Sequence, residues 1–273
     1  MLALAVPAVV AACLIHSPDL DREIGRRALP WLPPDLARQV VKHEREFGRG
    51  AKAAAAWPAS YHHAGGQQGV EHAIVLQCDR LVAAIRSRQP FAEVVAGFGT
   101  LAHLALDCNS PFVRARATDA HTQAFGVYMR NAAPRIPLVF YGQQPGLVRG
   151  RAGAVAPYLA SRSLDAATLG PLVREDLDRV GGPASWPRLD DRSTSFGAAS
   201  LVLNHAASDF ANLASWVWQN AGGLVPPVRD GQGTILIWTA DPRPREKAPS
   251  WVRREGTTGE SPSTRLGFRQ DRP

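Results

Sequence analysis

The sequence predicts an all-α protein, a bundle of many helices followed by a disordered tail. Apolar residues recur at helical spacing in most segments between residues 16 and 223, and Pro and Gly mark the ends of these segments. Alternating apolar and polar runs, which are typical of strands, are absent except in "TILIW" at residues 234–238. With 273 residues, 45 % of them apolar, the chain is long enough to bury one substantial core.

The predicted helices are delimited by Pro at their entries and by Gly or Pro after their ends. Pro33 opens one helix that Gly48 closes, Pro90 opens the next apolar helix, and Gly181 and Gly182 stop a later one. The longest predicted helix begins at Ser193. The predicted helices cover residues 21–29, 33–48, 70–88, 90–107, 119–131, 152–163, 169–182 and 193–220.

The first residues, 1–15, form an apolar segment of the length of an export signal, too short to span a bilayer and lacking a basic start. The "VAAC" motif that ends at Cys13 resembles a bacterial lipoprotein cleavage site. We therefore predict an exported protein, periplasmic, secreted or anchored as a lipoprotein, and a buried first helix is the alternative. In an exported protein Cys78 and Cys108 would be available for one disulfide, which their spacing alone does not decide.

Residues 224–273 form a tail rich in Pro, Gly, Ser and Arg, with too few apolar residues to offset the entropy lost on ordering. The sequence therefore predicts disorder there. The formal net charge of the whole chain is +7, which favours anionic partners such as a membrane surface or other phosphate-bearing molecules.

Two polar residues stand on the apolar helix predicted over residues 90–107. His103 and Asp107 are four residues apart, so one helical face presents an imidazole above a carboxylate. Burying either group without a partner is costly, and the two groups either bond to each other or converge on a metal ion. His205 and Asp209 repeat this spacing on the last helix, where a fastening role for Asp209 is the alternative to ligation.

The stretch "GFGTLAHLALDCNSPF" at residues 97–112 resembles the hallmark of the zinc-dependent phospholipase C and single-strand-specific nuclease superfamily. Four further segments, "DREIGRRALPWLPPDL", "YHHAGG", "AHTQAFGVY" and "SDFANLASWVWQNAGG", resemble other segments of that superfamily and occur in the same order. The resemblance covers residues 16–223 and implies a phospholipase C/nuclease-like multi-helix domain there, with residues 1–15 and 224–273 outside it.

The resemblance implies a zinc centre held by side chains from several helices. His103 and Asp107 match the central ligands, and His121 matches a ligand on the following helix. His62 or His63 matches the upstream histidine, and an alternative alignment places Ser60 there. His16 and Asp21 occupy the positions of the ligands before the first helix. Val113 stands where the superfamily has a histidine, and Phe125 or Gly126 stands where it has an acidic ligand. One to three zinc ions remain possible on this count.

These residues support two hypotheses of function. The first is a zinc-dependent phosphoester hydrolase, acting on a phospholipid or another phosphoester, with a metal-bound water expected as the nucleophile and nucleic acid not excluded as substrate. The second is a non-catalytic helical member that binds a membrane or an anionic partner. Trp57 and Tyr61, near the histidine pair, are candidates for lining a substrate cleft. We expect a monomer.

Overall fold

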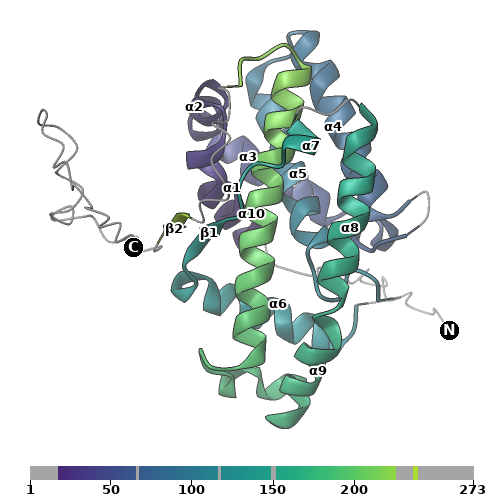
Figure 1. The fold of residues 1–273 in the computed structure, drawn as a ribbon, viewed down its shortest axis with the longest axis vertical. Helices are drawn as coiled ribbons and strands as arrows, with labels where there is room; N and C mark the ends of the chain where they lie inside the picture. Colours follow the sequence, from purple (N-terminus) through teal and green to yellow (C-terminus); the bar gives the residue numbers. More distant parts are fainter. Residues whose placement is uncertain (1–17, 66–67, 116–117, 149–151, 226–235, 239–273) are drawn as a thin grey trace, which may run out of the picture. The chain divides into compact units, whose positions relative to one another are not determined.

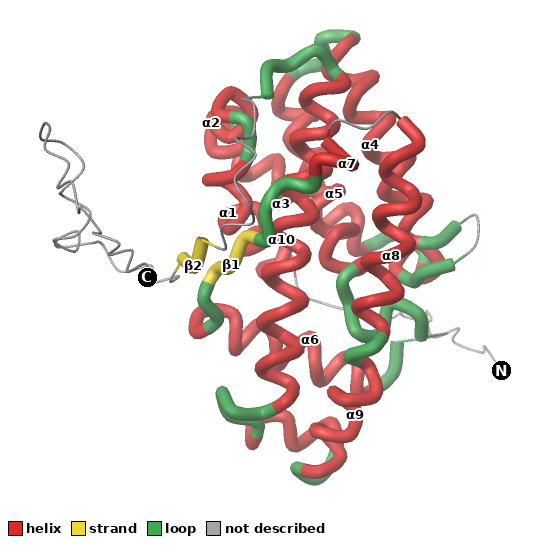
Figure 2. Tube along the Cα trace, viewed as in Figure 1, coloured by secondary structure: helices red, strands yellow, loops and turns green. Residues whose placement is uncertain are grey.

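The computed structural model describes residues 18–65, 68–115, 118–148, 152–225 and 236–238, and these residues are mostly helical (Figures 1 and 2). The predicted all-α fold class is confirmed. The predicted export segment, residues 1–15, and His16 lie outside the described residues, as does most of the tail over residues 224–273, so export and tail disorder stay predictions. All described residues belong to one compact unit, residues 1–240.

The described helices follow the order of the predicted ones. Their bounds are α1 Pro18–Ala28, α2 Pro34–Lys42, α3 Glu44–Ala55, α4 Val70–Arg86, α5 Phe91–Cys108, α6 Ala120–Ala132, α7 Pro145–Val148, α8 Val155–Ala167, α9 Gly170–Arg179 and α10 Thr194–Asn220. Short 3₁₀ segments add Leu29–Trp31, Ala59–His62 (η2), Ala133–Arg135, Ala152–Ala154 and Pro183–Arg188.

Capping residues set several of these helix ends. Ser193 accepts a hydrogen bond at its Oγ from Phe196 N at 3.1 Å and starts α10, and Asp119 caps α6 through Thr122 N at 2.9 Å. Gly181, which follows α9, has a φ of +111°, a left-handed conformation that stops a helix and that glycine adopts without strain. The stop and start signals in the sequence therefore act as predicted at these positions.

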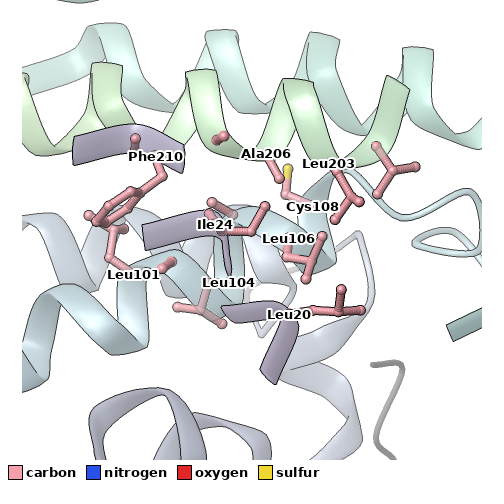
Figure 3. Close-up of a cluster of buried hydrophobic side chains, with 14 of the residues drawn as sticks. Leu20, Ile24, Leu101, Leu104, Leu106, Cys108, Leu203, Ala206 and Phe210 are labelled. Atoms are coloured by element: carbon pink, nitrogen blue, oxygen red, sulfur yellow. The ribbon is translucent and has the colours of Figure 1, made fainter. Parts of the chain in front are cut away.

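Helix α5 is the centre of the core, and it packs against α1, α3, α4, α8 and α10. By length and composition α5 alone, among the described residues, would also suit a membrane span, but 72 % of it is buried inside the protein. Figure 3 shows side chains of α1, α5 and α10 meeting in this core. The labelled residues are Leu20, Ile24, Leu101, Leu104, Leu106, Cys108, Leu203, Ala206 and Phe210.

Helices α3 and α5 approach so closely that glycine is required at the crossing. A Cβ on Gly50 would lie 1.7 Å from Ala96 O, and a Cβ on Gly99 would lie 1.9 Å from Phe47 O. Thr100 adds a hydrogen bond across the same contact, from its Oγ1 to Gly50 O at 3.1 Å. The crossing fixes α5, the helix that carries His103, against its neighbour.

Three features of the fold differ from the sequence prediction. The single helix predicted over residues 33–48 is two helices, divided at His43, whose φ of −117° and ψ of 37° are not helical, and α3 continues beyond Gly48. A second strand, β1 Leu138–Phe140, was missed; it pairs antiparallel with β2 Leu236–Trp238 inside the "TILIW" segment. Cys78 and Cys108 are both free and buried, so the disulfide that was considered does not form.

Candidate metal centre

His62, His103 and Asp107 come together inside the bundle. Their candidate ligand atoms lie within 4.8 Å of one another, and none of the three residues is more than 1 % exposed. Asp107 Oδ2 is 2.7 Å from His62 Nδ1 and 3.3 Å from His103 Nε2, and the two ring nitrogens are 3.4 Å apart. The i, i+4 pair predicted from the sequence therefore converges with one histidine of the upstream pair.

The elements that supply these side chains differ in kind. His103 and Asp107 stand one turn apart on the rigid helix α5, whereas His62 is the last residue of η2, next to Trp57 and Tyr61, whose rings meet edge to face at 5.7 Å. Trp57 O lies 3.3 Å from His62 Nε2 and accepts its N–H, which directs Nδ1 toward Asp107. A backbone carbonyl is a common partner for the outer nitrogen of a metal-binding histidine.

Asp21, a predicted ligand on α1, lies behind His103. Its Oδ2 is 3.0 Å from His103 Nδ1 and accepts that N–H, so His103 Nε2 is directed toward the centre of the cluster. Asp21 is fully buried and is not one of the three clustered residues. In this arrangement the carboxylate orients the imidazole, as carboxylate–histidine pairs do around zinc.

The three donors fit zinc in identity and spacing. Zinc takes nitrogen and carboxylate oxygen ligands at about 2.0–2.1 Å, and a tetrahedral arrangement then separates neighbouring ligand atoms by about 3.3 Å. Two of the three observed separations, 3.3 and 3.4 Å, already have this length, and only the 2.7 Å contact between His62 and Asp107 must widen. His62, His103 and Asp107 could hold one ion with little rearrangement.

His63 lies beside the cluster without belonging to it. Burial lowers the pKa of His63, and the negative charge of Asp107 acts in the opposite direction. The two side chains therefore interact electrostatically. Both ring nitrogens are buried near the backbone of Phe112 and Val113, yet neither meets hydrogen-bond geometry. His63 therefore lies near the turn that contains Val113, the position at which the sequence resemblance leads one to expect a histidine.

The structure does not bring His121 to this cluster. On α6 its Nε2 is 2.8 Å from Asp178 Oδ1, a partly exposed pair that joins α6 to α9. His205 is also separate, because its ring stacks on Tyr141 with ring centroids 4.1 Å apart. Sequence reasoning placed Asp21 among the ligands but gave no sign that it would orient His103, since the two residues are 82 positions apart.

Comparisons with known proteins extend only to the fold. No family model matches the chain, and no curated protein matches it in sequence. Solved structures that match include alpha-toxin of Clostridium perfringens from an avian strain, with a TM-score of 0.59 and 10 % identity, and alpha toxin of Clostridium absonum, with a TM-score of 0.55 and 11 % identity. They cover 78 % and 75 % of this chain.

This chain shares the fold of the matched part of the alpha-toxins. The match spans 66 % of each toxin chain, slightly less than two thirds of its length. The predicted likeness to the phospholipase C and nuclease superfamily is thus confirmed at the level of the fold, and at this low identity the function has to be argued from the side chains.

Proposed function

We propose that the chain is a zinc-dependent phosphoester hydrolase of phospholipase C-like type. The observation that carries the proposal is the buried donor set of His62, His103 and Asp107, with ligand atoms within 4.8 Å of one another on the alpha-toxin fold. Zinc held by three protein ligands keeps a position for water or substrate, and it supplies charge stabilisation and an acidified water for phosphoester hydrolysis.

Each protein group around the site has a defined task in this proposal. Asp107 contributes negative charge, and the two histidines contribute neutral nitrogens whose outer N–H groups are held by Asp21 and the Trp57 carbonyl. These outer contacts fix the ring orientations before a ligand arrives.

A cavity next to η2 offers room for part of a substrate. Its volume is about 220 Å³, and it is lined by Trp57, Tyr61, Leu76 and the exposed Arg80, among other residues. Arg80 forms no ion pair with a described residue, so its guanidinium is available to a phosphate group. The carbonyl of Trp57 contacts His62, so the cavity wall adjoins the candidate metal centre. A phospholipid or another phosphoester, nucleic acid included, is compatible with these features.

The test combines metal content with turnover. The protein is purified without chelator, zinc is measured by elemental analysis, and hydrolysis of bis(p-nitrophenyl) phosphate is followed. We expect about one zinc per chain, with zinc and activity both lost in His103→Ala because a three-ligand site does not survive on two. His121→Ala is the matched control and retains both. A zinc-free wild-type protein without turnover would refute the proposal.

The burial of the cluster favours one alternative, a non-catalytic member in which the metal stabilises the scaffold. His62 and Asp107 are 1 % and 0 % exposed, so a substrate reaches them only after the site opens. In this alternative the basic chain binds an anionic membrane surface. Zinc without turnover, together with salt-sensitive binding to anionic liposomes that persists in His103→Ala, would select it.

Export is part of the proposal, because the apolar residues 1–15 have signal-like length. Expression of the full chain in a bacterial host and fractionation of the cells test this point. We expect a processed form outside the cytoplasm, and an unprocessed cytoplasmic form would contradict export.

A further inference from the structure

A second polar cluster ties α5, α8 and α10 together, away from the candidate metal ligands. Asp209 on α10 is only 3 % exposed and accepts hydrogen bonds from the Tyr158 hydroxyl, from Asn109 Nδ2 at 2.8 Å and from Arg162 Nε at 3.3 Å. Burial and the neighbouring Asp209 carboxylate raise the pKa of Tyr158, so its hydroxyl stays protonated and donates. Asp209 therefore fastens α10 to two other helices.

Arg162 is the member of this cluster whose guanidinium has hydrogen-bond donors that the cluster does not use. Its side chain is 18 % exposed, and its only hydrogen bond to a described residue is the one from Nε to Asp209. Asp165 Oδ2 is 3.6 Å from Nη1, beyond hydrogen-bond distance, and that carboxylate is 67 % exposed and well hydrated. Both terminal amino groups of a largely buried guanidinium thus lack a close acceptor among the described residues.

A cavity of about 190 Å³ lies against Arg162, between α8, α10 and the end of α5. Its polar lining consists of Arg162, Asp165, Thr168, His205 and Asn109, and its apolar walls include Leu201 and Val202. The ring of His205 is held by stacking on Tyr141, with an angle of 15° between the planes. The cavity therefore combines oriented polar groups at one end with hydrocarbon walls, as small-molecule sites do.

The positive end of the Arg162–Asp209 pair faces this cavity. Arg162 and His205 line it, whereas Asp209 does not and is enclosed by Tyr158 and Asn109. Burial, followed by the positive charge of Arg162, lowers the pKa of His205 to about 4, and the opposing effects of the carboxylates are smaller. At neutral pH the cavity therefore presents the Arg162 guanidinium and a neutral imidazole, together with the largely exposed carboxylate of Asp165.

We propose that this cavity binds a small carboxylate with an apolar body, such as a short-chain fatty acid. The planar terminal amino groups of Arg162 match a carboxylate, which takes two parallel hydrogen bonds from a guanidinium. Leu201 and Val202 cover the apolar part. A doubly charged phosphate fits less well, because Asp209 and Asp165 already stand on either side of Arg162 and no second cation lines the cavity within the described residues.

The test is calorimetric titration of the full chain with sodium hexanoate, with 1-hexanol and inorganic phosphate as comparison ligands. We expect saturable binding of hexanoate, at least about tenfold tighter than either comparison ligand. Hexanol lacks the carboxylate that Arg162 would bind, and phosphate lacks the apolar chain. Binding of phosphate or hexanol as tightly as hexanoate would overturn the proposal, as would the absence of hexanoate binding.

Variants locate the binding and separate it from folding. Leu201→Trp fills the cavity from a residue that is 39 % exposed, and Leu172→Trp makes the same change at a 46 % exposed position outside the lining. Of these two variants, only Leu201→Trp should weaken hexanoate binding, by at least about tenfold. Arg162→Lys should weaken it as much, because lysine lacks the planar pair of terminal amino groups that binds a carboxylate. Unchanged binding in Leu201→Trp would refute the assignment. Because the cavity shares no residue with the candidate metal centre, His103→Ala should bind hexanoate normally.

Discussion

The crossing of α3 and α5 makes a quantitative prediction about Gly99. Replacing Gly99 by Ala places a Cβ 1.9 Å from Phe47 O, whereas ordinary van der Waals contacts begin at 3.4 Å. The clashing atom belongs to the backbone of α3 and cannot rotate away, so the two helices have to separate locally by roughly 1.5 Å, the difference between these two distances. Separation on this scale opens gaps along the best-packed contact in the core.

The expected cost follows from two opposing effects. Overpacking a core costs about 1–3 kcal/mol, and a backbone clash belongs at the upper end of that range. Alanine is better than glycine in a helix interior by roughly 0.5–1 kcal/mol. We therefore expect Gly99→Ala to lower the free energy of unfolding by about 2 kcal/mol, which lowers Tm by about 4–8 °C for a domain of this size.

Gly197 provides the matched control because it is also helical, in α10, and an added Cβ there meets nothing within 4 Å. Gly197→Ala should raise the free energy of unfolding by roughly 0.5–1 kcal/mol. Urea unfolding followed by circular dichroism measures both variants, with unchanged m values if only stability is affected. Equal stability of Gly99→Ala and Gly197→Ala would refute the close crossing.

Three further predictions concern the metal, the half-buried His205 and the thiols. Zinc at about 100 times its Kd should stabilise the protein by about 2.7 kcal/mol and raise Tm by roughly 5–10 °C, and Asp107→Ala should abolish the shift; no shift in the wild type would exclude the site. The pKa of His205 is lowered by burial from 6.5 to about 4, so the unfolded chain binds more protons between these values and stability should fall as pH drops from 6.5 toward 4. His205→Gln should flatten this fall in urea midpoints, and an unaltered slope would contradict the assignment. In a Cys13→Ser variant, Cys78 and Cys108 should react with a thiol reagent only after unfolding, because burial raises both pKa values; reaction in the native protein would disprove their burial.

The fold was predictable because its determinants are local. Pro90 and Ser193 mark helix starts, and Gly181 and Gly182 mark a stop, through backbone preferences that act over a few residues. The elements that were predicted wrongly or missed depend on tertiary contacts. Gly48 looked like a helix end, but α3 continues past it, and β1 forms only because Leu138–Phe140 meets a partner about a hundred residues later.

The candidate site was predictable where helical geometry decides it. His103 and Asp107 face the same way because they are one turn apart on α5. His62 was one of two neighbouring candidates, and only the path of η2, with the Trp57 carbonyl behind His62, distinguishes it from His63. The pairing of Asp21 with His103 depends on how α1 packs on α5, which no short sequence pattern encodes.

The number of metal ions can be argued from what fills the remaining ligand positions. The sequence resemblance places further ligands at Val113 and at Phe125 or Gly126, and Val113 and Phe125 are 0 % and 2 % exposed within the apolar core. Phe125 packs edge to face on Phe112 with ring centroids 6.1 Å apart, so hydrocarbon occupies that space. A second ion there would lie in an apolar environment without compensating charge, at a prohibitive desolvation cost. Among the described residues, the donors that remain, His62, His103 and Asp107, suffice for a single zinc, and we propose that this part of the chain holds one.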